Sequence, residues 1–149
     1  MATKSNVIFL GGMNSARTQM AEALLRHHAG DQFEVFSAGV QPSELNPHAV
    51  RAMDEIGIDI RQQQSKGSKA YMGRMFFRYI IILAKEDDEL YPQALWAQSG
   101  VKLHWPFDDP ASATGTDEEI MAKFCEVRDQ IDQKIKAWLE QLATEKVDV

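Results

Sequence analysis

The chain has 149 residues, one cysteine, 44% hydrophobic residues and a formal net charge of −6. This length is enough to bury one ordinary core, so we expect a single domain over residues 1–149. The acidic balance argues against nucleic acid or an anionic membrane as the main partner, because both favour clustered positive charge. The sequence has neither a signal-peptide core nor an apolar stretch of about 20 residues, so we expect a cytoplasmic protein.

Apolar periodicity predicts strands that alternate with helices along the chain. The predicted elements are a strand at 6–10, a helix at 16–29, a strand at 33–37, a helix at 46–56, a short turn or helix near 68–72, a strand at 77–83, a short helix near 86–96, a strand at 101–105 and a helix at 117–143. This alternation indicates an α/β fold with three α/β/α layers, in which helices cover both faces of a four-stranded parallel sheet.

Two of the predicted core elements, the strand at 77–83 and the long helix at 117–143, have distinct patterns. Ile80, Ile81 and Ile82 form the β-branched run typical of a strand buried on both faces. Thr116 and Glu119 fit a capping box at the start of the long helix. An apolar stripe at helical spacing follows, and we interpret it as core packing: Ile120, Phe124, Val127, Ile131, Ile135 and Leu139.

Cys125 lies in the same predicted helix and is the only cysteine of the chain. A single cysteine excludes an internal disulfide. Its place in an amphipathic helix favours a buried packing role over a reactive one.

Residues 11–17 connect the first predicted strand to the first helix and have the features of an anion-binding loop. Gly11 and Gly12 allow unusual backbone angles and close approach of a ligand. Backbone N–H groups converge at a helix N-terminus, where the helix dipole also favours negative charge. Arg17 adds a fork of donors that matches phosphate-like oxygens.

Short motifs along nearly the whole chain are similar in order and spacing to those of one family. They are Asn14-Ser15, Arg17-Thr18-Gln19-Met20-Ala21-Glu22, Ser37-Ala38-Gly39, Asn46-Pro47, Ala49-Val50, Ile56-Gly57-Ile58-Asp59-Ile60, His104-Trp105 and Phe107-Asp108-Asp109-Pro110. The pattern resembles the low-molecular-weight protein tyrosine phosphatase superfamily, and most closely its thioredoxin-coupled arsenate reductase branch. The resemblance implies a low-molecular-weight phosphatase-like fold.

The same resemblance implies that the reactive cysteines of the family are missing. The attacking cysteine, which becomes a thiolate in such a loop, would stand at Gly11, and a second loop cysteine at Ala16. Two further cysteines of the reductase branch relay a disulfide outward to thioredoxin, and Ala84 and Tyr91 stand at their places. We therefore expect no functional thioredoxin relay and no cofactor.

The resemblance also implies a site. Oxyanion binding is assigned to Gly11, Gly12, Met13, Asn14, Ser15, Ala16, Arg17 and Thr18. The leaving-group acid maps to Asp109, now vestigial, with Asp108 as the weaker candidate; either carboxylate could instead shape the turn before Pro110. Arg17 would share the catalytic role with Asp109.

Three side chains of the loop need separate interpretation. Met13 stands where the family usually has glycine, and a Cβ atom at a positive φ would cost roughly 1–2 kcal/mol. Its thioether either fills the pocket or lies outside it. Ser15 and Thr18 carry hydroxyls, but hydrogen bonding within the loop and at the helix start is favoured over a role as nucleophile.

Some reductases of this branch hold potassium beside the loop with asparagine, glutamate, serine and aspartate. Asn14, Glu22 and Ser37 match three of these residues, whereas Lys66 falls near the fourth. The Lys66 ammonium either takes the place of the cation and pairs with Glu22 or is an ordinary solvated lysine. We predict no metal, because the four histidines also lack metal-ligand spacing.

Three functions remain open at this point. The first is a catalytically inactive protein that binds phosphate, arsenate, sulfate or an anionic group of a partner at residues 11–17. The second is an active phosphatase or arsenate reductase-type enzyme with a displaced nucleophile, such as water assisted by Asp109. The third is a protein-interaction module with a non-functional pocket, which would use the exposed Met72–Phe77 region, where Met75, Phe76 and Phe77 cluster beside Tyr71. Core packing of that cluster against the sheet is favoured over an exposed surface.

Overall fold

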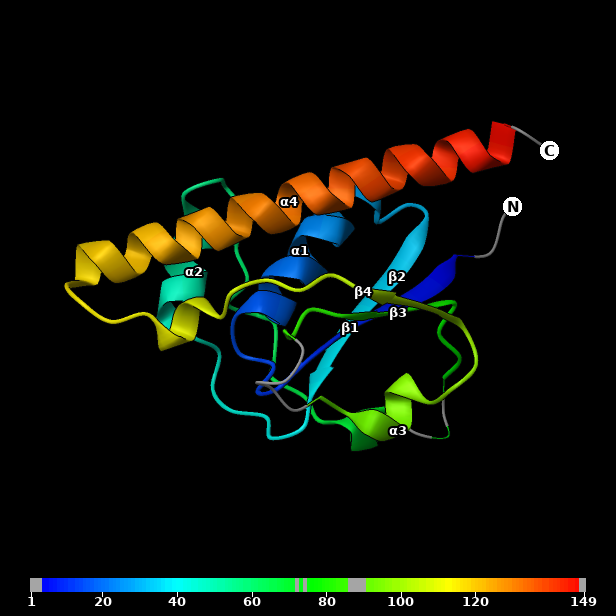
Figure 1. The fold of residues 1–149 in the computed structure, drawn as a ribbon, viewed down its shortest axis with the longest axis horizontal. Coiled ribbons are helices and arrows are strands. Elements are labelled where there is room, and N and C mark those ends of the chain that lie inside the picture. Colours follow the sequence, from blue (N-terminus) through cyan, green and yellow to red (C-terminus); the bar gives the residue numbers. More distant parts are fainter. Residues whose placement is uncertain (1–3, 72, 74, 86–90, 148–149) are drawn as a thin grey trace.

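Four parallel strands form one sheet in the order β2-β1-β3-β4 in the computed structural model, which describes residues 4–71, 73, 75–85 and 91–147. The elements are β1 (Ser5–Gly11), α1 (Arg17–Ala29), β2 (Phe33–Gly39), α2 (Pro47–Asp54), the 3-10 turn η1 (Ser68–Ala70), β3 (Tyr79–Ile82), α3 (Gln93–Trp96), β4 (Val101–His104), the 3-10 turn η2 (Pro110–Ser112) and α4 (Asp117–Val147). Helices α1, α2 and α4 cover one face, and α3 lies on the other (Figure 1). The predicted three-layer α/β/α fold is confirmed.

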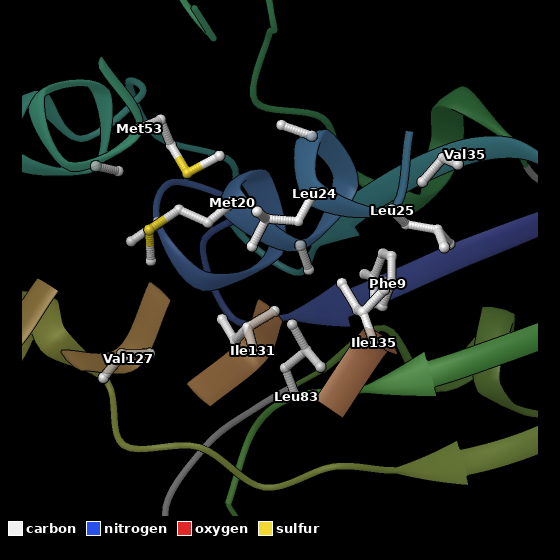
Figure 2. Packing of buried hydrophobic residues seen from close by; sticks show 14 of the residues in the cluster. Phe9, Met20, Leu24, Leu25, Val35, Met53, Leu83, Val127, Ile131 and Ile135 are labelled. Atoms are coloured by element: carbon white, nitrogen blue, oxygen red, sulfur yellow. The ribbon is translucent and has the colours of Figure 1, made fainter. Parts of the chain in front are cut away.

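The central strand β1 contributes to two separate cores because its side chains alternate between the two faces. Val7 and Phe9 pack into the cluster beneath α1 and α4, whereas Ile8 and Leu10 pack into the cluster on the α3 side. Figure 2 shows side chains of β1, α1 and α4 converging in the first cluster. Burial on both faces explains why β1 is a continuous apolar run rather than an alternating one.

Helix α4 begins with the predicted capping box. The backbone N–H of Glu119 donates to the Thr116 hydroxyl, and the N–H of Thr116 donates to the Glu119 carboxylate, both at 3.2 Å. The predicted apolar stripe faces the core: Phe124, Val127, Ile131 and Ile135 are fully buried, and Ile120 and Leu139 pack partly buried against them. The helix continues to Val147, beyond the predicted end at 143.

Several other predicted boundaries were wrong by one to three residues. Asn46 is the cap of α2 rather than its first residue, since its side chain accepts from the His48 N–H at 2.8 Å. The helix ends at Asp54 because Gly57, with φ +80°, turns the chain into the left-handed region. Strand β3 is shorter than 77–83, and the N-terminal part of the helix predicted near 86–96 lies outside the described residues, as does the end of the turn near 68–72.

The aromatic cluster around η1 divides between core and surface. Tyr71 and Phe77 are buried, Met75 is half-buried and Phe76 is 79% exposed. Core packing of the cluster was therefore the right interpretation for its larger part. Among the described residues, no helix combines the length and apolar character that crossing a membrane requires.

Candidate functional site

The loop between β1 and α1 lies at the carboxyl end of the sheet, against the end of β2. The N–H groups of Val40 and Gln41 donate to the Gly12 carbonyl at 2.7 and 3.1 Å. This contact depends on Gly39, because a Cβ atom there would lie 2.7 Å from the Asn14 nitrogen and from the Gly12 oxygen. A glycine at the end of β2 thus allows two backbone segments to touch beside the loop.

Asn14 organises the loop from inside. It is 2% exposed and is the only non-glycine residue with a positive φ (52°) in the described part of the chain. Its Nδ2 donates to Thr18 Oγ1 (2.9 Å) and Ser37 Oγ (2.8 Å). Its Oδ1 accepts from Gln19 Nε2 (3.0 Å) and the Lys66 N–H (2.6 Å). Four bonds from one side chain therefore hold the loop to α1, β2 and the segment before η1.

Glu22 lies beneath this network as a buried carboxylate, 3% exposed. It accepts from the Ser37 hydroxyl at 2.6 Å and from Arg26 at 2.8 Å, and Lys66 Nζ lies 3.9 Å from its Oε1. Burial, followed by the negative charge of Glu22, raises the pKa of Tyr71, which donates to the Ser37 carbonyl. The predicted pairing of Lys66 with Glu22 is present, so two cations balance the buried charge.

A cavity of about 230 Å³ opens above the loop. It brings together all eight residues of the predicted oxyanion site and the predicted acid: Gly11, Gly12, Met13, Asn14, Ser15, Ala16, Arg17, Thr18 and Asp109. Sequence reasoning missed three further lining residues, Val40, Gln41 and Ala111. The position of Val40 and Gln41 directly after the predicted Ser37-Ala38-Gly39 motif could have indicated them, because neighbouring parallel strands end at the same edge of the sheet.

The start of α1 faces this cavity without a cap. Ala16 occupies the N-cap position, no side chain caps the first turn, and the first turn has no acidic residue. Uncapped N–H groups at a helix N-terminus, together with the helix dipole, favour a bound anion. Helix α1 begins at Arg17, one residue later than predicted.

Arg17 is 7% exposed and is held from below. One terminal nitrogen donates to the carbonyls of Phe107 (2.9 Å) and Leu83 (3.4 Å). The other lies 3.9 Å from Asp109 Oδ2. These contacts orient the guanidinium between the loop and η2, where it lines the cavity as a fixed positive charge.

The two adjacent aspartates have different environments. Asp109 lines the cavity and caps η2 by accepting from the Ala111 N–H at 3.0 Å, so it serves the turn before Pro110 and faces the loop at once. Asp108 instead bonds to Lys123 (2.8 Å) and pairs with Lys85. Those ammonium groups, Lys123 first, lower the Asp108 pKa to about 2. The structure therefore favours Asp109 over Asp108 at the cavity, as the sequence indicated.

The expected strain at Met13 is absent, because the positive φ of the loop falls on the next residue, Asn14. An asparagine tolerates that conformation better than most side chains. Met13 is 52% exposed and lines the mouth of the cavity. Its thioether therefore does not bury itself in the pocket.

Thr18 and Ser15 both help to hold the loop in place. Thr18 Oγ1 accepts from Asn14, as described above, and the Ser15 backbone carbonyl accepts from the Asn46 N–H at 2.9 Å. No histidine lines the cavity among the described residues, and no group of three or more His, Cys, Asp or Glu residues there forms a metal site. Cys125, in the first third of α4, is partly buried rather than fully buried, and burial raises the pKa of its thiol.

Residues 6–148 match the family described as low molecular weight phosphotyrosine protein phosphatase. The chain belongs to this family. Within it, the chain is 39% identical over 137 residues to an arsenate reductase of Halalkalibacterium halodurans, covering 92% of this chain and 96% of the relative. It is 37% identical over 134 residues to an arsenate reductase of Bacillus subtilis, covering 90% and 94%.

Solved structures of the phosphatase family have the same fold. A structure described as an arsenate reductase in the phosphate binding state superposes with a TM-score of 0.76 at 26% identity, covering 92% of this chain and 98% of the other. A Vibrio vulnificus Wzb structure in complex with benzylphosphonate gives 0.71 at 17% identity, covering 93% and 99%, which shows the fold alone. The predicted resemblance to the phosphatase superfamily and its arsenate reductases is confirmed.

Proposed function

We propose that this chain binds an oxyanion at residues 11–18 without converting it. The ligand is phosphate, arsenate or sulfate, or a phosphate or carboxylate group on a partner. The observation that carries the proposal is a complete cradle around a position with no nucleophile. The uncapped start of α1, the buried Arg17 and the cavity remain, whereas Gly11 has no side chain to attack with.

Two observations support anion binding. The structure described as an arsenate reductase in the phosphate binding state superposes along nearly its whole length, and the loop network around Asn14 holds the backbone of this chain in a defined shape. A missing thiolate also removes a negative charge that would repel a bound dianion. Phosphate therefore meets one fixed cation and a helix dipole at this site, opposed by the Asp109 carboxylate alone among the lining side chains.

The same reasoning argues against redox chemistry of the reductase type. The named relatives are arsenate reductases, but this chain has Ala84 and Tyr91 at the places that the resemblance gives to the relay cysteines. Ala84 is 1% exposed, so even a thiol at that position would be buried. Cys125, with its raised pKa, does not replace them. We propose that the chain has no thioredoxin-coupled activity.

The test is a calorimetric titration of the full chain with phosphate, arsenate and sulfate. Wild type is expected to bind in a saturable way, and Arg17→Ala to bind at least about tenfold more weakly, a loss of about 1.4 kcal/mol. Arg61→Ala is the matched control, because Arg61 is an exposed arginine that pairs with Asp54 and Asp59 away from the cavity. Arg17→Lys keeps the positive charge but loses the two-pronged guanidinium, so its affinity should lie between those of wild type and Arg17→Ala.

Two outcomes would contradict the proposal. No saturable heat at millimolar ligand would show that the cradle does not bind these anions. Hydrolysis of p-nitrophenyl phosphate or reduction of arsenate by wild type, abolished in Arg17→Ala, would show that the site turns ligands over.

A second function has one observation in its favour. Asp109 faces the cavity with its Oδ2 only 3.9 Å from Arg17, so it could assist attack by water on a bound phosphate ester. Weak hydrolysis that is lost in Asp109→Asn but retained in Asp108→Asn would support this alternative. Among the described residues of the proposed interaction region, the exposed large side chain is Phe76, since Tyr71 and Phe77 are buried; Met72 lies outside the described residues.

A further inference from the structure

A second cavity, of about 490 Å³, lies between strands β3 and β4 and the C-terminal half of α4. It shares no lining residue with the cavity above the anion loop. Its size falls in the range of small-molecule sites, roughly 300–1,000 Å³. The two cavities are therefore separate candidates for binding.

Three aromatic rings in series line this cavity. Tyr79 of β3 meets Trp138 of α4 edge to face at 5.0 Å between ring centroids, and Trp138 meets Trp105, just after β4, at 5.5 Å. Both tryptophans are held rigidly, being only 6% and 7% exposed. Half-buried Leu103 and Leu142 add aliphatic surface. Together these residues form the apolar part of a lining whose remaining surface is polar, and they offer a packing surface to a ring-shaped or aliphatic body.

A cation lies at each end of the ring series. The Arg78 guanidinium carbon is 5.5 Å from the Tyr79 centroid, and Lys134 Nζ is 5.7 Å from the Trp105 centroid. Both distances are typical of cation–π contacts. Neither Arg78 nor Lys134 forms an ion pair within the part of the chain that the structure describes. Most other described lysines and arginines do form ion pairs. Examples are Lys4–Glu34, Arg26–Glu22, Arg51–Asp117, Arg61–Asp54, Lys85–Asp108 and Lys136–Asp132.

In a chain of net charge −6, two cations without carboxylate partners beside one cavity are an excess of local positive charge. Glu145 is the acidic residue of the lining, and its Oε1 accepts from Gln141 at 3.4 Å near the end of α4. The lining thus has two positive charges against one negative charge. A neutral apolar ligand would satisfy the rings but would leave both cations without a counter-charge.

We propose that this cavity binds an aromatic acid, a ring system that carries a carboxylate, sulfonate or phosphate group. The rings and leucines bury the apolar body of the ligand, and Lys134 or Arg78 pairs with its acidic group. Because the cations already lie over ring faces, little side-chain ordering is needed on binding. The proposal is independent of the anion loop and of its function.

The test uses 1-anilinonaphthalene-8-sulfonate as the probe and the full chain. Saturable binding of one probe per chain is expected, with energy transfer from Trp105 and Trp138. At least one of Lys134→Met and Arg78→Met, the one that removes the cation paired with the sulfonate, should weaken binding at least about fivefold, since each removes a charge and keeps an apolar stem over the ring. Lys69→Met, an exposed lysine outside the cavity, is the matched control and should leave binding unchanged.

Further arms locate the probe. Saturating phosphate and the Arg17→Ala variant should leave probe binding unchanged, which separates this cavity from the anion loop. Uncharged 1-anilinonaphthalene should bind more weakly than the sulfonate. Near-UV circular dichroism must match wild type for each variant; Lys134→Gln and Arg78→Gln replace any variant that fails to fold. Absence of saturable binding, displacement by phosphate, or equal affinity of the cavity variants and Lys69→Met would overturn the proposal.

Discussion

The Cγ2 methyl of Thr18 lies 2.9 Å from the place that a Cβ atom on Gly11 would occupy. Real Cβ contacts are essentially never this short, so any larger residue at position 11 must displace Thr18. That displacement has a cost, because Thr18 Oγ1 accepts a hydrogen bond from Asn14 and the side chain is 3% exposed. Packing within the loop therefore matches the small residue at its first position.

Gly11→Cys should consequently destabilise the protein by about 1–3 kcal/mol, as expected for overpacking. Adding Thr18→Ser removes the obstructing methyl and keeps the hydroxyl, so the double variant should regain part of this loss. Urea unfolding of the two variants and of Gly11→Ala measures the effect. If Thr18→Ser recovered no stability in the Gly11→Cys background, the steric explanation would be wrong.

The same double variant tests the cradle chemically. A thiol at position 11 would stand at the uncapped start of α1 beside Arg17, where its pKa should fall. We expect Gly11→Cys with Thr18→Ser to hydrolyse p-nitrophenyl phosphate, while wild type and the Gly11→Ala control do not. Equal rates in all three would show that the missing thiol is not what prevents turnover.

Asn14 should reveal the cost of the left-handed backbone in the loop. Asn14→Ala and Asn14→Gly lose the same side-chain hydrogen bonds, but only alanine keeps a Cβ at φ 52°. We expect Asn14→Ala to be less stable than Asn14→Gly by about 1 kcal/mol in urea unfolding. The reverse order would mean that the loop changes its backbone when the side chain is lost.

Lys66 should stabilise the buried carboxylate of Glu22. Lys66→Met is expected to lower the free energy of unfolding by about 1 kcal/mol, a modest value because Arg26 and Ser37 still bind Glu22 and Lys66 is itself 30% exposed. Lys69→Met, on the exposed surface, should have no comparable effect.

The Lys66 variant also offers a cation test. Removing the ammonium leaves the Gln64 carbonyl and the Glu22 carboxylate, with the Ser37 hydroxyl bound to that carboxylate, without a nearby ammonium. Potassium chloride should then stabilise Lys66→Met more than tetramethylammonium chloride at the same ionic strength does, whereas wild type should not distinguish the two salts. A Lys66→Met variant equally insensitive to both cations would show that the ammonium does not occupy a cation position.

The Asp108 carboxylate should contribute to the way the free energy of unfolding depends on pH in the acid range. Its pKa is lowered from 3.8 to about 2 in the folded chain by Lys123 and Lys85, so its contribution is complete above the unfolded value and is lost as the pH falls toward about 2. Wild type should therefore lose more stability than Asp108→Asn does between pH 6, above the unfolded value, and pH 3, below it. Urea midpoints at both values measure this, with Asp31→Asn, an exposed residue, as the control.

Local patterns carried the prediction of the fold. The run from Val7 to Leu10, the three isoleucines of β3 and the stripe of α4 are apolar at spacings that only one type of element can bury. The capping box at Thr116 and Glu119 is equally local, because its two hydrogen bonds join residues three apart. Such local patterns can be recognised without knowing how the rest of the chain folds.

Long-range contacts limited the prediction of the site. Val40, Gln41 and Ala111 line the cavity only because β2 and η2 end beside the loop. The same holds for Arg17, whose partners Leu83 and Phe107 lie 66 and 90 residues away along the chain. Phe76 and Phe77 are neighbours in sequence, yet one is exposed and the other is buried.

The alternation of strands and helices, the glycine-rich loop that begins at Gly11 and the family could all be predicted before the fold was known, because they follow from residue types and spacings within short stretches of chain. Three other features emerged from the folded chain alone: Asn14 rather than Met13 takes the left-handed conformation, Thr18 closes on Gly11, and Arg78 and Lys134 flank one row of rings. These features depend on steric contacts between segments that the sheet brings together, and such contacts have no periodic signature in sequence.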